Sequence, residues 1–249
     1  RAYGLFQFYG ANRTGRWTGK LIQLQNLPQN HMPDLDNARW VISSGDYDLA
    51  TMMYDNIPNV LSELIRTAFV APEGKVFAVS DFSAIEARVL SWVAGEEWRL
   101  EGFRNHGKIY EASASMMFGV PIESVTKGSE LRQRGKTSEL ALGYQGGVSA
   151  LTAMDREGRI PEHEKADIVT RWRQANPNIV KLWNVVEKHA IHAITTKKSS
   201  QYRCLTFECN GDFLMIGLPS GRKLNYVKPS IGKNRFGNTS EVGIFEMGE

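Results

Sequence analysis

The sequence has little of what marks membrane-bound, secreted or disulfide-stabilised proteins. It contains no run of about 18 apolar residues, so no membrane span is expected. Its start, RAYGLFQFYG, lacks the shape of a signal peptide, and the absence of an initiator Met leads us to expect a piece of a longer protein. The two cysteines, Cys204 and Cys209, are not spaced as a zinc pair, and a disulfide is not expected in a chain of cytosolic character.

Charge of one sign is not in large excess, but it is unevenly placed. The 249 residues carry a formal net charge of +3, and a content of 42% hydrophobic and 23% charged residues is ordinary for one large domain or two lobes. Residues 1–20 hold four cations and no acid, and residues 197–235 hold eight cations against Glu208 and Asp212. These basic segments suggest a polyanion as partner, and the alternative is ordinary surface charge.

Hydrophobic periodicity predicts both helices and strands. The alternation in LIQLQNLPQ predicts a short extended segment that ends at Pro28. Residues 46–70 have a helical period, and we expect Pro58 to split them into two helices. Residues 96–185 are mostly helical by pattern, and residues 201–228, with PSGR as a turn, have the pattern of a β-ribbon.

An acid follows a run of residues that is typical of a buried strand. Val76 to Val79 is continuously apolar, as expected of a strand buried on both faces, and Asp81 comes at its end. A carboxylate there costs several kcal/mol unless it is paired or binds a metal. Because Mg²⁺ takes oxygen ligands, usually few of them from protein, Asp81 is a candidate magnesium ligand. The alternative is an Asp that only caps the following helix.

The helix after Asp81 carries a second acid that has two interpretations. Its period begins at Ser83, and we expect Gly95 to end it. Ser83 to Glu86 matches a capping box, in which Ser83 is the N-cap and Glu86 reaches back to it. The alternative is that Glu86 faces the same cleft as Asp81, and spacing does not decide between the two.

The stretch RQRGKTSELALGYQGG, which starts at Arg132, has three cations at the head of a predicted helix: Arg132, Arg134 and Lys136. The helix dipole is already positive there, so each cation costs roughly 0.3–1 kcal/mol. A bound anion would reverse the sign of this effect. The pattern therefore favours a phosphate-binding helix, and the alternative is a solvated basic helix.

The same helix carries a stripe of residues spaced four apart: Arg132, Lys136, Leu140 and Tyr144. Each step of four drifts by only about 40°, and the stripe is roughly 18 Å long. That is a suitable length for a nucleoside triphosphate whose phosphates lie at the cationic end. The chain has no Walker-type glycine loop, so side chains would have to form the phosphate site.

The segment RWTGKLIQLQNLPQ offers an arginine and three amides, Arg16, Gln23, Gln25 and Asn26. Such side chains donate hydrogen bonds to minor-groove acceptors and to phosphates. The alternative is a polar loop.

Taken together, the three stretches closely resemble family A, polymerase I-like, DNA polymerases, and most of all the phage and prophage branch. DFSAIEARVL resembles motif A of the family, RQRGKTSELALGY followed by glycine resembles motif B, and RWTGKLIQLQNLP resembles the primer–template segment. The resemblance spans nearly all of this chain but only part of a polymerase. It implies an α+β fold, a partial right hand with palm residues 1–93, helical fingers 94–185, and a palm β-ribbon with a truncated tail 186–249.

The resemblance also implies a role for each candidate residue. Asp81 would be one of the two metal-binding aspartates for Mg²⁺, assisted by the backbone carbonyl of Phe82. Glu86 would be the steric gate against a ribose 2′-hydroxyl. Arg132 and Lys136 would hold the triphosphate, and Lys136 would protonate the departing pyrophosphate.

The remaining implied contacts are with the nascent base pair and with DNA. Tyr144 would lie beside the nascent base pair and could hydrogen-bond Glu86. The implied DNA contacts are Arg16, Thr18, Gln23, Gln25, Asn26 and Gly146.

Two positions depart from the pattern of the family. Leu140 stands where the family usually has Phe or Tyr beside the sugar, so we expect discrimination against dideoxynucleotides. Tyr110 stands where many relatives carry a His that reaches the triphosphate; a tyrosine hydroxyl donates a hydrogen bond but brings no charge.

The second metal-binding aspartate of the family, in a His-Asp pair, has no counterpart. The chain contains no His-Asp dipeptide, and Asp212 in CNGDF is a remote substitute. We therefore expect the chain to end before this motif and to lack C-terminal palm and N-terminal thumb segments of the same polymerase. The fragment alone is then expected to be inactive or very weak.

The resulting hypothesis is a template-directed DNA polymerase that transfers nucleotides from dNTPs to a primer 3′-hydroxyl by a two-metal mechanism, present as an incomplete catalytic core. The expected partners are primer–template DNA and dNTPs, with no membrane, in the cytoplasm of a bacterial cell or phage-infected host. Two alternatives stay open. One is a non-catalytic DNA-binding module that keeps the fold, and the other is a single-subunit RNA polymerase, against which Glu86 argues.

Overall fold

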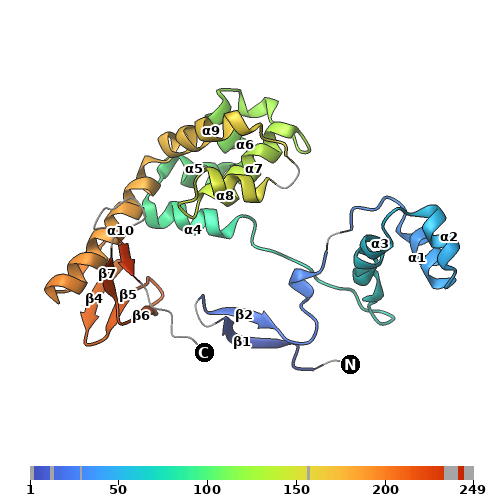
Figure 1. Cartoon of the computed structure of the whole chain (residues 1–249), viewed down its shortest axis with the longest axis horizontal. Coiled ribbons are helices and arrows are strands. Elements are labelled where there is room, and N and C mark those ends of the chain that lie inside the picture. The colour runs from blue at the N-terminus through green and yellow to red at the C-terminus, as the bar shows by residue number, and fades with distance from the viewer. Residues whose placement is uncertain (1–2, 12–13, 29, 156–157, 233–240, 244–249) are drawn as a thin grey trace. The chain divides into compact units, whose positions relative to one another are not determined.

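The computed structural model describes residues 3–11, 14–28, 30–155, 158–232 and 241–243. The chain forms two compact units, Arg1–Asp81 and Phe82–Glu249, whose elements are labelled in Figure 1. Helices and antiparallel sheets occur together, which confirms the α+β class. None of the described helices is long and apolar enough to cross a membrane.

The first unit begins with a hairpin of β1 (Phe6–Ala11) and β2 (Arg16–Gly19), paired antiparallel. The next segment is not the extended stretch that its alternation predicts. It contains the 3₁₀ turn η1 (Leu24–Asn26), because Asn26 bonds back to Gln23 through both its backbone N–H, at 2.9 Å, and its side-chain amide, at 2.6 Å. An extended segment would need a partner strand for its backbone hydrogen bonds, whereas here Asn26 finds its partner locally.

Three short helices follow: α1 (Leu35–Ser43), α2 (Tyr47–Met53) and α3 (Ile57–Leu64), the last continued by η2 (Ile65–Ala68). Each helix starts at a residue whose side chain accepts a bond from the backbone N–H three residues on, namely Asp34, Asp46 and Asn56. Pro58 lies in the first turn of α3, which confirms the predicted split into two helices.

A buried acid ties α3 to the chain before α1. The Glu63 carboxylate accepts the backbone N–H of His31 at 2.7 Å and that of Met32 at 2.8 Å. These two bonds favour the ionised form and lower the pKa of Glu63.

The predicted buried strand at Val76–Val79 is wrong. Residues 69–84 form no helix or strand, and Val76 and Val79 are 89% and 88% exposed. A strand of this kind exists only when neighbouring strands pair with it and both faces are covered. No described strand pairs with this segment.

The second unit is built mainly from helices, as the pattern of residues 96–185 predicts. They are α4 (Ile85–Ala94), α5 (Glu97–Asn105), α6 (Ile109–Phe118), η3 (Ile122–Ser124), α7 (Glu130–Leu142), α8 (Val148–Met154), α9 (Glu162–Ala175) and α10 (Pro177–Thr196). Gly95, at φ 73°, ends α4 as predicted. Trp172 is fully buried and stacks on Trp183, with ring centroids 6.0 Å apart.

The long helix α10 joins these helices to a four-stranded antiparallel sheet (Figure 1). Its strands are β3 (Ser200–Tyr202), β4 (Leu205–Asn210), β5 (Phe213–Gly217) and β6 (Lys223–Val227), hydrogen-bonded in chain order. The buried residues Phe207, Leu214 and Ile216 belong to the same core as Trp172. A separate ribbon pairs β7 (Ser230–Gly232) with β8 (Glu241–Gly243). The predicted β-ribbon at 201–228 is thus confirmed.

Candidate functional site

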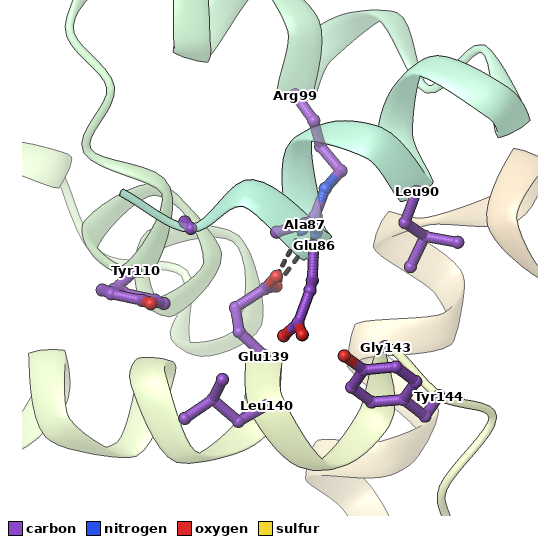
Figure 2. Close-up of a pocket in the computed structure, with 10 residues that line it drawn as sticks. Glu86, Ala87, Leu90, Arg99, Tyr110, Glu139, Leu140, Gly143 and Tyr144 are labelled. Atoms are coloured by element: carbon purple, nitrogen blue, oxygen red, sulfur yellow. Dashed lines mark hydrogen bonds and ion pairs between the residues drawn. The ribbon is translucent and has the colours of Figure 1, made fainter. Parts of the chain in front are cut away.

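A pocket of about 120 Å³ opens between α4 and α7 in the second unit. Its walls come from four helices and their ends: Ala84, Glu86, Ala87, Leu90, Arg99, Tyr110, Glu139, Leu140, Gly143 and Tyr144. Four of these, Glu86, Tyr110, Leu140 and Tyr144, are residues for which the sequence predicts a nucleotide site, and Figure 2 shows them around one space.

The predicted capping box at Ser83–Glu86 is wrong. The N-cap of α4 is Ala84, whose backbone is left-handed at φ 49°, and no side chain caps the helix. Ser83 lies one residue too early, and its carbonyl accepts the Arg88 Nε–H at 2.9 Å. Glu86 therefore lines the pocket, and its carboxylate points toward the Tyr144 hydroxyl in Figure 2.

Helix α7 begins and ends at residues suited to its caps. The Ser129 hydroxyl accepts the Arg132 backbone N–H at 3.3 Å, and Gly143 is the C-cap. Tyr144 follows directly, on the turn after the helix. It is 67% exposed and forms part of the pocket wall.

Two of the three cations at the head of α7 have carboxylate partners. Arg132 Nε lies 2.6 Å from Glu111 Oε1 on α6. Arg134 pairs with Glu130 at 2.7 Å and with Glu164 on α9 at 3.1 Å. Lys136 forms no ion pair within the described part of the chain. The dipole cost that the sequence predicts is thus offset by carboxylates for both arginines.

The ring of Tyr110 lies beside the guanidinium of Arg132. The Arg132 guanidinium carbon lies 5.6 Å from the centroid of the Tyr110 ring. Burial raises the pKa of the Tyr110 hydroxyl, and the nearby charge of Glu139 raises it further, against the opposing effect of Arg132. The hydroxyl therefore stays protonated at neutral pH and is available as a hydrogen-bond donor to a bound ligand.

Asp81 and Phe82, the candidate metal-binding residues, are exposed and lie in the segment without regular structure. Asp81 ends the first unit, so its approach to the pocket of the second unit stays a prediction. A single carboxylate fits Mg²⁺, which usually takes one or two from protein. Among the described residues there is no group of three or more His, Cys, Asp or Glu side chains that could hold a metal ion.

The candidate DNA-contacting residues lie in several elements. Arg16 and Thr18 are on β2, where a Cβ on Gly10 of β1 would lie only 1.8 Å from the Thr18 hydroxyl. The side-chain oxygen of Gln23 accepts a hydrogen bond from the side-chain N–H of Asn26. Gln25 is exposed within η1.

Gly146, the last candidate DNA contact, has a structural explanation of its own. A Cβ at this position would lie 2.1 Å from the Ala141 carbonyl oxygen and 2.8 Å from the Ala150 Cβ. The close approach of the turn after α7 to α8 therefore requires glycine.

Sequence reasoning missed the charged group at the base of the pocket. Arg99 and Glu139 are both buried and form an ion pair, drawn with dashed lines in Figure 2. A signal was present, because Glu139 stands within the apolar half of α7, between Ser138 and Leu140.

Comparison with known proteins agrees with the motifs. A family model described as DNA polymerase family A matches residues 7–210. The chain is 55% identical over 245 residues to the DNA polymerase of Bacillus phage SP02, covering 95% of this chain and 37% of that protein. It is 35% identical over 140 residues to the thermostable DNA polymerase I of Thermus aquaticus, covering 55% of this chain and 16% of that protein. This chain therefore spans well under half of these relatives, and it belongs to DNA polymerase family A.

Proposed function

We propose that the protein is a template-directed DNA polymerase, and that this chain provides part of its catalytic core. The observation that carries the proposal is the pocket that gathers Glu86, Tyr110, Leu140 and Tyr144, in a chain of polymerase family A. The substrates would be a primer–template duplex and a dNTP. The primer 3′-hydroxyl would attack the α-phosphate of the dNTP, forming a phosphodiester and releasing pyrophosphate.

The cations of α7 would bind the triphosphate. Lys136, which forms no ion pair within the described residues, would meet the phosphates directly and give a proton to the leaving pyrophosphate. Arg132 would loosen its contact with Glu111 and bind a phosphate oxygen. The neutral Tyr110 hydroxyl would donate a hydrogen bond beside them.

The pocket wall would select the sugar. Glu86 would exclude a ribose 2′-hydroxyl, because the added oxygen would meet the carboxylate and the Tyr144 ring. Leu140 would lie beside the sugar, and we expect discrimination against dideoxynucleotides. The DNA would run along Arg16, Thr18, Gln23, Gln25, Asn26 and Gly146.

Asp81 and the Phe82 carbonyl would contribute to binding of Mg²⁺. When bound, two such ions activate the primer 3′-hydroxyl and stabilise the charge of the leaving group. We also propose that residues 1–93 and 186–249 are palm segments and residues 94–185 the fingers. The compact units divide at Asp81, within the proposed palm.

The test is primer extension by the full-length protein with Asp81→Ala. We expect extension to be lost and primer–template affinity to be kept, because the substitution removes a metal ligand and leaves the DNA contacts. Asp55→Ala is the matched control, since Asp55 is another exposed acid of the first unit, and it should leave extension unchanged. Extension retained by Asp81→Ala would reject the role of Asp81.

Two other outcomes would replace the proposal. Salt-dependent DNA binding without extension by the unaltered protein would indicate a non-catalytic DNA-binding module. Preference for rNTPs over dNTPs would indicate a single-subunit RNA polymerase.

A further inference from the structure

The core of the second unit holds an ion pair that the proposed chemistry does not use. Arg99 is fully buried and Glu139 is 5% exposed. Arg99 Nη1 lies 2.9 Å from Glu139 Oε1, and Nη2 contacts Oε2, so the guanidinium and carboxylate meet as a two-pronged pair. Removing two charges from water is costly, and well-packed apolar side chains in such a place are often as stabilising. Stability alone therefore does not explain this pair.

The carboxylate of Glu139, on α7, is held from three sides. Besides Arg99 on α5, it accepts the indole N–H of Trp172 on α9 at 2.8 Å and the hydroxyl of Ser113 on α6. Each bond arrives from a different helix, and each has its own direction. Together they oppose rotation of α7 about its axis as well as sliding along it.

The guanidinium of Arg99 extends the same network to two further helices. Its Nε–H donates to the Ser91 hydroxyl on α4 at 2.8 Å. Its Nη1 donates to Asn176 Oδ1, at the junction of α9 and α10, at 2.9 Å. Helix α4 carries Glu86, and α7 carries Lys136 and Leu140. The network therefore connects the two helices between which the pocket opens.

The pair also forms part of the pocket wall. Glu139 directly precedes Leu140 and lies about one turn beyond Lys136 on α7. Its charge reaches Tyr110, whose pKa it helps to raise after the larger effect of burial. A small rotation of α7 would displace Lys136 and Leu140 together, and misplacement by about 1 Å can lower a rate about 100-fold.

We propose that Arg99 and Glu139 are positioning residues, which hold α7 in the rotation that presents Lys136 and Leu140 to the incoming nucleotide. The inference rests on the proposed function. It assigns to a buried ion pair a part in dNTP binding, although neither residue would touch the triphosphate.

The test compares the full-length protein with the double variant Arg99→Met, Glu139→Leu. Apolar packing compensates for the lost ion pair, but the Trp172 indole N–H and the Ser113 hydroxyl lose their acceptor, so we expect a lower melting temperature in a chain that stays folded at the assay temperature. We nevertheless expect KM for dNTPs to rise by about tenfold or more, because α7 loses its directional bonds, with Kd for primer–template unchanged. Arg99→Lys, which keeps the charge and loses the two-pronged geometry, should give an intermediate KM.

The matched control replaces the exposed pair on α5, Glu97 and Arg104, by Leu and Met. It should leave both KM and melting temperature unchanged. A double variant at Arg99 and Glu139 with the original KM would overturn the proposal and leave the pair a structural role only.

If the double variant does not fold, Arg99→Lys decides the question, because it keeps the charge opposite Glu139 and loses the two-pronged geometry. A raised KM at unchanged melting temperature supports the proposal, and an unchanged KM overturns it. Failure of the unaltered protein to extend a primer would instead reject the proposed function itself.

Discussion

Arg132 and Lys136 stand one turn apart on α7, but in the described part of the chain only the arginine has a carboxylate partner. An incoming phosphate would have to compete with Glu111 for Arg132, whereas Lys136 is paired with no acid there. The identity of both cations is readable from the sequence, but Glu111 lies 21 residues before Arg132. Which cation is neutralised therefore depends on how α6 packs against α7.

Tyr110 provides a pH test at this scale. Because its pKa is raised, the folded chain keeps a proton that the unfolded chain, with an ordinary tyrosine pKa of about 10, releases. The stability from this effect is complete below about pH 10 and is lost as pH rises through the raised pKa. In a spectroscopic titration of phenolate at high pH, the difference between the original chain and Tyr110→Phe should show one tyrosine that ionises late. A difference curve centred at or below pH 10 would contradict the assignment.

Among the elements, helices were predictable and the strand at Val76–Val79 was not. Helix ends depend on neighbouring residues such as Ser129, Pro58 and Gly95, so local sequence specifies them. A strand depends on partners elsewhere in the chain, and no described strand pairs with this segment. Packing between helices is likewise invisible in a periodic pattern. Gly135 in α7 shows this, since a Cβ there would lie 2.4 Å from the Tyr110 carbonyl oxygen on α6.

Alanine at this glycine tests the packing of α6 on α7. In an open helix, Gly→Ala stabilises by roughly 0.5–1 kcal/mol. At Gly135 we expect the opposite sign, because forcing a methyl group into a closed contact typically costs about 1–3 kcal/mol. Gly102→Ala in α5 is the matched control, since its Cβ would come no closer than 3.6 Å to the His106 ring. Urea unfolding should show a loss of stability for Gly135→Ala and a gain for Gly102→Ala; a gain at both positions would refute the close contact.

At the scale of the whole molecule, the chain consists of two compact units, Arg1–Asp81 and Phe82–Glu249. The segment that leads from η2 to α4, residues 69–84, has no helix or strand. It includes Asp81 and Phe82, the residues proposed for metal binding. The candidate residues that line the pocket, in contrast, lie on packed helices or, in the case of Tyr144, on the turn after α7.

Limited proteolysis checks this organisation. Trypsin should cleave first at Lys75, which is exposed and lies in the middle of residues 69–84, a long segment that forms no helix or strand. Arg66 should be cut later, because its side chain bonds the Leu27 and Pro28 carbonyls at 2.7 and 2.6 Å. Mass spectrometry of the early fragments identifies the site, and Lys75→Gln should delay the first cut. Early cleavage within the second unit, with Lys75 intact, would show that the segment is protected.

The sequence by itself determined the family, most of the helices, the end of α4 at Gly95 and the β-ribbon, because motifs and helix-ending signals each act over a few neighbouring residues. It also identified Glu86, Tyr110, Leu140 and Tyr144 as candidates. Only the tertiary structure decided that these four line one pocket and that Ser83 caps no helix. It likewise revealed that Arg99 and Glu139, 40 residues apart, neutralise each other in the core. The physical reason is that burial and pairing are set by contacts between distant segments, which no local pattern records.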